Sequence, residues 1–255
     1  AHTDWNNSDQ PVAVTDPTGR RTTTIYDPAT NWATDVYGPA PVGCFNGLVP
    51  TTACEGSVGH THTDYDDGMD GLAATYWPNK TLSSADRPIH AFAAGPLAFN
   101  WGPGAPAGLP GDFSAQFTGS ITFPAAGTYK VGSCQDNKAR VFIDDKVVAD
   151  AWTSPACVAG NDFVVTAANE THRIRVDYAD TGGDASLTLN WTRPNGTQEL
   201  VPGPHLSPRY GLVTKSTTAD TTPGPPPEVT ETPHGLNPPP VMAHTAGVDP
   251  RGPHL

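Results

Sequence analysis

Apolar and polar side chains alternate at period two through much of the region from residue 71 to residue 201. The clearest alternating sets are Val141/Ile143, Ile174/Val176/Tyr178 and Leu187/Leu189/Trp191. Such alternation is typical of strands that turn one face toward a core. Clusters of Gly, Pro, Asn and Asp separate these stretches, and helical periodicity is almost absent. The pattern predicts an all-β sandwich or barrel over residues 71–201.

The two flanks have strand chemistry but no predicted core of their own. Residues 1–43 hold short alternating stretches that end at turn-forming dipeptides such as Asp-Pro. Residues 44–70 are expected to form a connector closed by a Cys pair. Residues 202–255 are expected to form a strand and then a Pro-rich extended tail. Because an isolated pair of strands is marginally stable in water, we expect the flanks to lean on something larger.

Composition narrows the choice of partners. Gly and Pro together make up about a fifth of the 255 residues, and hydrophobic residues make up 36%, which fits one core with extended flanks. The formal net charge of −12 disfavours nucleic acid and anionic membrane surfaces and suits divalent cations. We see no apolar run long enough for a membrane-spanning helix and no signal-peptide pattern at the start, so we expect a mature product or an excised fragment.

The four cysteines form two local pairs, Cys44 with Cys54 and Cys134 with Cys157. No C-x-x-C spacing supports a zinc site, so two short-loop disulfides are the favoured interpretation. They imply an oxidising compartment, and hence a secreted or cell-surface protein. Four reduced, buried thiols are the alternative.

A series of motifs in the predicted β-region resembles a known family. In chain order these motifs are Gly71-Leu72, Tyr76-Trp77, Asn100-Trp101-Gly102, Pro106, Asp112–Gly119, Pro124–Tyr129, Val141–Asp145, Ala151-Trp152, Ile174–Tyr178 and Ala185–Trp191. They are similar to the protective-antigen (PA14) domain, a β-sandwich module of toxins, glycosidases and adhesins. The resemblance implies a β-sandwich over residues 71–201.

The flanks resemble a second family, the tyrosine-aspartate (YD, or Rhs) repeats of large secreted bacterial shell proteins. The residues that carry this resemblance are Val14–Gly19, Thr24–Pro28, Tyr37–Pro41 and Tyr210–Thr214. In that family each repeat is a hairpin that stacks on its neighbours. The resemblance therefore implies a fragment of a larger secreted protein, with the sandwich inserted between repeat segments.

The first resemblance also implies a calcium site. Sugar-binding members carry two consecutive Asp residues, joined by a cis peptide, that ligate a calcium ion which binds sugar hydroxyls. The matching positions here are Asp136 and Asn137, followed by Lys138. An Asn oxygen can ligate calcium, but one carboxylate is missing and a positive charge has been added. A solvated turn beside the Cys134 disulfide is the alternative.

A second loop, before the last strand of the sandwich, lies beside the metal in sugar-binding relatives. In this chain it holds Asp180, Gly182, Gly183 and Asp184, which become candidate glycan-binding residues. Glycines permit close approach, and carboxylates accept hydrogen bonds from sugar hydroxyls. The same composition is also that of an ordinary turn.

Other candidate residues have structural interpretations. His60 and His62 would face one side of a strand near acidic residues, but their spacing does not match a calcium loop, and a polar connector is favoured over a zinc or calcium site. Trp5 and Trp32 are candidate stacking platforms for sugars. The remaining tryptophans, which lie in family motifs, are expected in the core; they are Trp77, Trp101, Trp152 and Trp191.

No motif predicts an enzyme. The chain has no G-x-S-x-G elbow, no phosphate-binding Gly-rich loop and no H-E-x-x-H, and its adjacent acid pairs would point to opposite faces of strands. We therefore expect a non-catalytic, extracellular carbohydrate-binding or adhesion module, assisted by calcium, whose partner is a glycan or cell-surface polysaccharide. One alternative is a structural element that assembles through its extended termini. Another is an accessory domain of a glycosidase.

Overall fold

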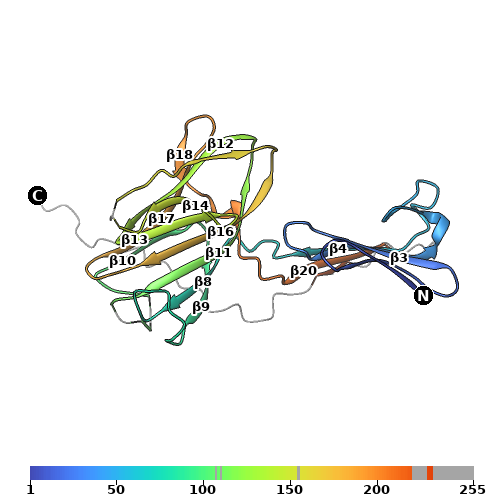
Figure 1. Ribbon diagram of the computed structural model, residues 1–255, viewed down its shortest axis with the longest axis horizontal. Coiled ribbons are helices and arrows are strands. Elements are labelled where there is room, and N and C mark those ends of the chain that lie inside the picture. Colours follow the sequence, from blue (N-terminus) through green and yellow to red (C-terminus); the bar gives the residue numbers. More distant parts are fainter. Residues whose placement is uncertain (107, 110, 154–155, 220–228, 232–255) are drawn as a thin grey trace, which may run out of the picture. The chain divides into compact units, whose positions relative to one another are not determined.

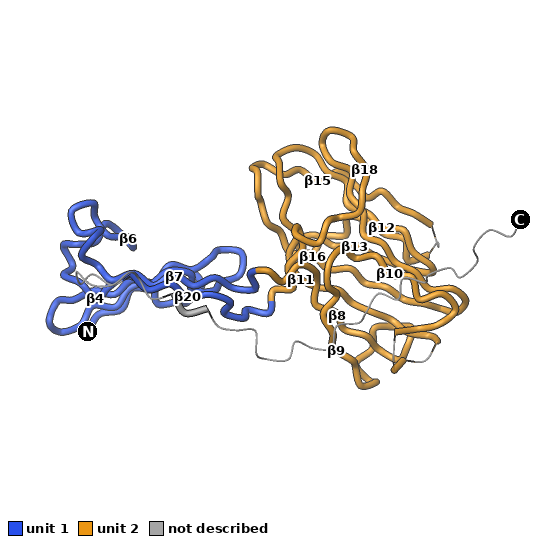
Figure 2. Tube along the Cα trace, turned by 180° about the vertical axis from the view of Figure 1, so that it is seen from behind, with its two compact units in different colours: residues 1–67, 210–236 blue, residues 68–209, 237–255 orange. Residues whose placement is uncertain are grey.

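The computed structural model describes residues 1–106, 108–109, 111–153, 156–219 and 229–231. It divides the chain into two compact units, shown in different colours in Figure 2. Unit 1 contains residues 1–67 and the described residues from Tyr210 onward, and unit 2 contains Gly68–Arg209. Most of the Pro-rich tail expected at the C-terminus lies outside the described residues.

Unit 2 is a sandwich of two antiparallel sheets (Figure 1). Sheet I has the order β14-β13-β16-β11-β8-β9, with β19 paired to β11, and sheet II has the order β10-β17-β12-β15, with β18 paired to β17. The strands of sheet I are β8 (Gly71–Trp77), β9 (Ile89–Ala94), β11 (Ser114–Phe123), β13 (Lys138–Ile143), β14 (Lys146–Ala151), β16 (Glu170–Ala179) and β19 (Leu206–Ser207). Those of sheet II are β10 (Ala98–Gly102), β12 (Gly127–Asp136), β15 (Asp162–Val165), β17 (Ala185–Thr192) and β18 (Gln198–Leu200). A short 3-10 helix, η2 (Gly203–His205), follows β18.

The core lies between these two sheets and follows the alternation seen in the sequence. Along β17 every second residue is buried, from Ala185 to Trp191. Aromatic rings join the two layers, with the ring centroids of Phe99 and Phe117 5.5 Å apart and those of Phe123 and Trp191 6.0 Å apart. The predicted all-β sandwich is confirmed.

Unit 1 is built on one sheet with the order β1-β2-β3-β4-β7-β20-β21. Its strands are β1 (His2–Trp5), β2 (Pro11–Thr15), β3 (Arg20–Tyr26), β4 (Ala33–Pro41), β7 (His60–Tyr65), β20 (Val213–Ala219) and β21 (Val229–Glu231). A 3-10 turn, η1 (Val42–Cys44), and a small hairpin of β5 (Phe45–Asn46) and β6 (Val49–Pro50) lie in the loop between β4 and β7. Among the residues of this unit whose burial is described, few apolar side chains are buried; they are Ala13, Ala40 and Val58.

The structure differs from the expected division of the chain in one important way. Residues 60–65, expected to belong to a polar connector, form β7, which pairs with β4 on one side and with β20 on the other. The hydrophobic pattern of the sequence did not identify this strand, because its side chains are half-buried throughout and show no alternation of buried and exposed positions. Segments on both sides of the sandwich thus share one sheet, although neither was expected to form a core of its own.

Asp66 closes unit 1 at the point where the chain leaves for unit 2 and returns. The residue is 5% exposed, and its carboxylate accepts hydrogen bonds from the backbone amides of Gly211 at 2.9 Å and Leu212 at 3.0 Å. The amide of Asp67 donates to the hydroxyl of Thr214 at 3.2 Å. Polar contacts therefore join the segment that follows β7 to the segment at the start of β20, where the chain enters and leaves unit 2.

Both expected disulfides are present, Cys44–Cys54 in unit 1 and Cys134–Cys157 in unit 2. Beside the second one, Gly132 lies so close to the segment after Cys157 that a Cβ added to it would be 1.8 Å from the carbonyl oxygen of Val158. Among the described residues no helix is long and apolar enough to cross a membrane.

Candidate functional site

The turn between β12 and β13 carries the first predicted pair of site residues. β12 ends at Asp136, β13 begins at Lys138, and the Asp136–Asn137 peptide is cis. The side-chain amide of Asn137 donates to Oδ1 of Asp136 at 2.7 Å. The hydroxyl of Tyr178, on the neighbouring β16, donates to the carbonyl oxygen of Asp136. Both site side chains are half-buried at the end of the sandwich.

The second predicted loop lies directly against this turn. Oδ1 of Asn137 accepts hydrogen bonds from the backbone amide of Thr181 at 2.6 Å and from its hydroxyl at 3.1 Å. Gly182 and Gly183, which follow, have φ values of +117° and +97°, a region that favours glycine. The tertiary structure therefore brings together two loops that are far apart in the sequence, and Asn137 joins them.

Asp180 lies beneath this loop edge rather than on it. The residue is fully buried, its Oδ1 accepts from the amide of Gly182 at 3.0 Å, and its Oδ2 has no hydrogen-bond partner. Burial raises the pKa of Asp180, and the negative charges of Asp112 and Asp136 add to the effect. The expected role of Asp180 as a direct sugar contact does not fit its burial. A buried carboxylate oxygen without a partner is instead a candidate cation ligand.

The exposed part of the loop consists of Thr181, Gly182, Gly183 and Asp184. These residues present backbone groups and one carboxylate to solvent, with no bulky side chain at the two glycines. Of the predicted glycan-binding set, Gly182, Gly183 and Asp184 therefore remain accessible.

Two neighbours of this site were missed in the sequence. Asp112 lies so close to the loop that a Cβ on Gly182 would be 3.6 Å from its Oδ1. The ammonium of Lys80 forms an ion pair with Asp112 at 2.8 Å and donates to the carbonyl of Thr181 at 3.2 Å. Both residues lie in segments far from Asp136, and nothing in their local pattern marks them as site residues.

Comparison with known proteins agrees with this architecture. Residues 68–203, more than half of the chain, match the PA14 domain. The chain belongs to the PA14 domain family. The match begins where unit 2 begins and ends within it, so the resemblance of the flanks to tyrosine-aspartate repeats stays a prediction.

Several known proteins are similar to part of this chain. The chain is 25% identical over 117 residues to the anti-sigma-I factor RsgI3 of Acetivibrio thermocellus. This matched stretch covers 45% of the present chain and 18% of RsgI3. A solved anti-sigma factor domain-containing protein is 24% identical, with a TM-score of 0.50 over 56% of this chain and 50% of that one. The structure of a PA14 sugar-binding domain from an RTX adhesin is 18% identical, with a TM-score of 0.44 over 55% of this chain and 99% of that one. The chain thus spans less than a fifth of the anti-sigma-I factor and half of the solved anti-sigma factor chain. The likeness to that solved chain concerns the fold alone.

The tryptophans of the PA14 domain divide into core and surface residues. Trp77 and Trp191 are buried, and Trp101 stacks on Phe99 with ring centroids 4.9 Å apart, as expected. Trp152 differs, because it lies half-exposed under the guanidinium of Arg140, 5.1 Å from its ring centroid. In unit 1, Trp5 is 61% exposed, whereas Trp32 packs against Tyr65 and is a poorer platform for a sugar than expected.

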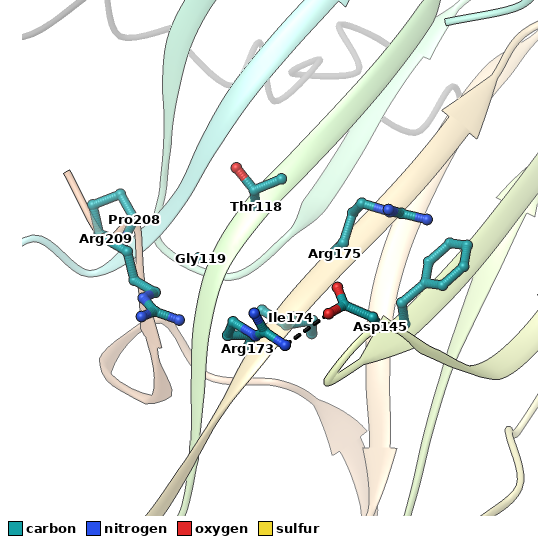
Figure 3. Close-up of a pocket in the computed structure, with 9 residues that line it drawn as sticks. Thr118, Gly119, Asp145, Arg173, Ile174, Arg175, Pro208 and Arg209 are labelled. Carbon is teal, nitrogen blue, oxygen red and sulfur yellow. Dashed lines mark hydrogen bonds and ion pairs between the residues drawn. The ribbon is translucent and has the colours of Figure 1, made fainter. Parts of the chain in front are cut away.

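A separate pocket of about 260 Å³ on the PA14 domain has a basic lining (Figure 3). It includes Arg173, which pairs with Asp145 at 2.7 Å, and Arg175, which lies over the ring of Phe142 at 3.8 Å. Arg173 lies on β16, and Asp180 comes seven positions later, directly after the strand ends, which corresponds to roughly 23 Å at about 3.3 Å per residue. The pocket is therefore distinct from the Asp136–Asn137 site.

Unit 1 holds a third polar cluster, which includes both histidines expected to be connector residues. Within the described part of the chain, three His, Cys, Asp or Glu side chains bring ligand atoms within 4.8 Å of one another only at Asp35, His60 and His62. The hydrogen bond to Asp35 raises the pKa of His62. Among the described residues, no three carboxylates around Asp180 reach this mutual distance.

Proposed function

We propose that the PA14 domain binds carbohydrate without catalysis at the loop edge formed by Asp136, Asn137 and residues 181–184, assisted by calcium. The observation that carries the proposal is the junction of these two loops around Asp180, whose Oδ2 is buried and unpartnered. Membership of the PA14 family supports it, because the resemblance of the Asp136–Asn137 turn to sugar-binding members implies calcium there.

The residues around Asp180 fit a hard divalent cation. Calcium prefers six to eight oxygen ligands, and the carboxylates of Asp136 and Asp180 are oxygen ligands of this kind. Asp136 and Asp180 would hold the ion through carboxylate oxygens, and Asn137 would contribute its side-chain oxygen in exchange for its hydrogen bond from the Thr181 hydroxyl. When bound, calcium supplies open coordination positions for sugar hydroxyl oxygens. With one carboxylate fewer than a paired-Asp site, we expect a weak affinity, about 10⁻⁴–10⁻³ M, as in other extracellular modules.

The exposed loop residues would bind the sugar itself. Gly182 and Gly183 leave the backbone open to close approach, and the carboxylate of Asp184 is free to accept hydroxyl hydrogen bonds from a bound ring. The ion pair of Lys80 with Asp112 supports the loop through the carbonyl of Thr181. The loop edge that would bind the sugar is thus already partly formed and held in position by contacts within the chain.

The test is a glycan array probed with the whole chain, with and without a calcium chelator. We expect glycan binding that the chelator weakens and that Asp136→Ala abolishes. Arg173→Ala, in the separate basic pocket, is the matched control and should bind as wild type does. Binding that survives both chelator and Asp136→Ala would place the sugar elsewhere.

We further propose that the chain is part of a larger secreted or cell-surface protein of bacterial origin, built on tyrosine-aspartate repeats. The two disulfides and the repeat-like motifs of unit 1 support this context. Assembly through the termini and an accessory role in a glycosidase stay predictions, because the tail lies largely outside the described residues. Analytical ultracentrifugation of the chain, which would detect oligomers, tests the assembly alternative.

A further inference from the structure

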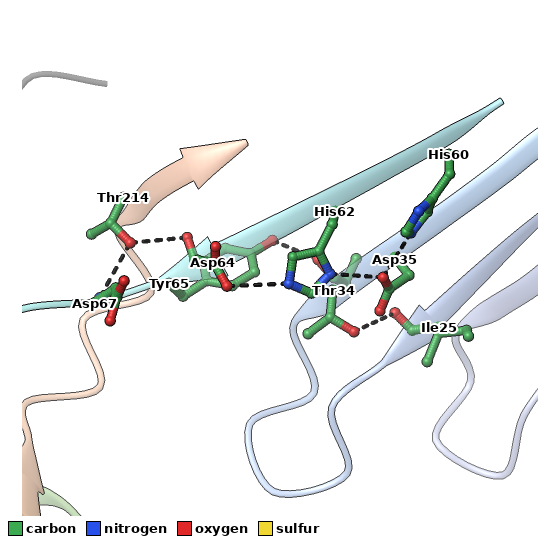
Figure 4. Close-up of polar contacts among 10 residues, drawn as sticks. Ile25, Thr34, Asp35, His60, His62, Asp64, Tyr65, Asp67 and Thr214 are labelled. Atoms are coloured by element: carbon green, nitrogen blue, oxygen red, sulfur yellow. Dashed lines mark hydrogen bonds and ion pairs between the residues drawn. The ribbon is translucent and has the colours of Figure 1, made fainter. Parts of the chain in front are cut away.

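Two histidines and one aspartate converge on one face of the unit 1 sheet. β4 and β7 are antiparallel neighbours, with Asp35 opposite His62 and Tyr37 opposite His60. Because side chains alternate along a strand, His60 and His62 project from the same face of β7 and meet Asp35 there. Figure 4 shows both imidazole rings directed at the same carboxylate.

The ligand atoms of this cluster already have nearly the spacing of a metal site. Oδ1 of Asp35 lies 2.9 Å from Nε2 of His60 and 2.7 Å from Nδ1 of His62. A tetrahedral ion with bonds of about 2.0–2.1 Å holds its ligand atoms roughly 3.3 Å apart. Replacing the shared protons by an ion therefore requires each nitrogen to move away from Oδ1 of Asp35 by only about half an ångström, and all three ligand atoms already lie within 4.8 Å of one another.

The surroundings hold both rings in orientation. Oδ1 of Asp64 lies 3.1 Å from Nε2 of His62, on the side of the ring that faces away from Asp35. Metal-ligating histidines commonly donate their second ring N–H to such a carboxylate, which orients the ring and fixes the tautomer. The ring of Tyr37 stacks on His60, with centroids 4.2 Å apart and planes 10° from parallel.

The site is also open to solvent on one side. The side chains of His60 and His62 are 32% and 43% exposed, whereas that of Asp35 is 19% exposed. An ion can therefore enter, and a fourth position is available to water or to a ligand atom from outside. Thiolates do not compete, because all four cysteines are in disulfides.

We propose that Asp35, His60 and His62 bind one divalent transition-metal ion of the zinc class, with Asp64 positioning the ring of His62. Two imidazole nitrogens and one carboxylate oxygen suit zinc, cobalt or nickel and exclude calcium as the preferred ion, because calcium takes oxygen ligands. The ion would link β4 to β7, the two paired strands that are connected by the loop containing the Cys44–Cys54 disulfide. This site lies in unit 1 and is independent of the function proposed for the PA14 domain.

The chain offers a matched control for a simple ion-pair network. His172 lies between Asp144 at 2.7 Å and Glu170 at 3.0 Å, so it too bridges two carboxylates. It lacks a second histidine, and its partners face opposite ring nitrogens. His172→Gln therefore removes an equivalent hydrogen-bond network without removing a convergent set of ligand atoms.

The experiment is a zinc titration of the whole chain by calorimetry, repeated with cobalt while the visible absorption of the tetrahedral ion is recorded. Wild type and His172→Gln should each bind one high-affinity ion that excess calcium does not displace. His62→Gln and Asp35→Asn should abolish this binding, and Asp64→Asn should weaken it about 10–100-fold.

His60→Gln provides an independent removal of a ligand should either of the first two variants fail to fold, as judged by circular dichroism. Equal zinc affinity in wild type, His60→Gln and His62→Gln would overturn the proposal. So would a wild-type chain that shows no zinc heat and no cobalt spectrum at micromolar metal.

Discussion

Asn137→Asp restores the second carboxylate that paired-Asp sites carry, and the structure indicates what this change costs. In the present chain the Asn137 amide donates to Oδ1 of Asp136 at 2.7 Å, and its Oδ1 accepts from Thr181. The variant keeps the second contact but turns the first from a hydrogen bond into a repulsion between two carboxylates. We expect the variant to be less stable than wild type without calcium and to recover when calcium is added.

The magnitude follows from that distance. Two unit charges 2.7 Å apart repel by about 6 kcal/mol at an effective dielectric constant of about 20, and by about 1.5 kcal/mol in water. The side chains of Asp136 and Asn137 are half-exposed and free to move apart, so the lower value is the better guide. Adding about 0.5–1.5 kcal/mol for the lost hydrogen bond gives a destabilisation of about 2–3 kcal/mol.

The assay is thermal unfolding of the chain followed by tryptophan fluorescence, in chelator and in millimolar calcium. For a domain of about 150 residues this loss corresponds to a Tm lower by roughly 4–12 °C. Asn195→Asp is the control, because its side-chain oxygen accepts from the amide of Thr197 in an exposed turn, as a carboxylate also would. An Asn137→Asp variant with an unchanged Tm in chelator would refute the geometry, and one that calcium fails to rescue would refute the metal site.

Three further changes test other parts of the structure. Gly132→Ala should destabilise the PA14 domain by about 2–4 kcal/mol in denaturant unfolding, because the added Cβ would overlap the carbonyl of Val158. An unchanged denaturant midpoint would contradict the close packing of these two segments. Asp66→Ala should destabilise unit 1 by about 2–4 kcal/mol, since two backbone amides lose a charged acceptor. Limited proteolysis of this variant should cut unit 1 first, and early cleavage inside the PA14 domain would contradict the prediction. Hydrogen bonds led by the amide of Ala167 lower the pKa of Glu170 to about 2. The contribution of this carboxylate to the free energy of unfolding is therefore complete above about pH 5 and is lost as pH falls toward 2. Glu170→Gln should reduce the loss of stability between about pH 5 and pH 2, and a variant with the same dependence of stability on pH as wild type would contradict this role of Glu170.

The amino-acid sequence alone was sufficient for the PA14 sandwich and for both disulfides. Inward positions such as Val141, Val176 and Leu189 alternate with polar ones, and this local period selects strands with one buried face. Cysteines separated by 10 and 23 positions pair within their own loops, so their partners are near in sequence as well as in space.

Pattern alone did not identify β7 as a strand, because its residues are polar on both faces. In a sheet with little buried apolar area, hydrogen bonding to neighbouring strands decides whether His60–Tyr65 forms a strand. One of those neighbours, β20, lies about 150 positions away, and no local signal carries that information.

For the candidate binding sites, too, some features follow from the sequence and others only from the tertiary structure. The sequence by itself determined which residues were available, namely Asp136, Asn137 and the Gly-rich loop that follows β16, because motif and composition are local properties. Only the tertiary structure decided that Asp180 is buried with an unpartnered oxygen, and that Asp35 meets His60 and His62. Burial and the convergence of ligand atoms depend on which strands become neighbours, and that is settled by packing and pairing over the whole chain.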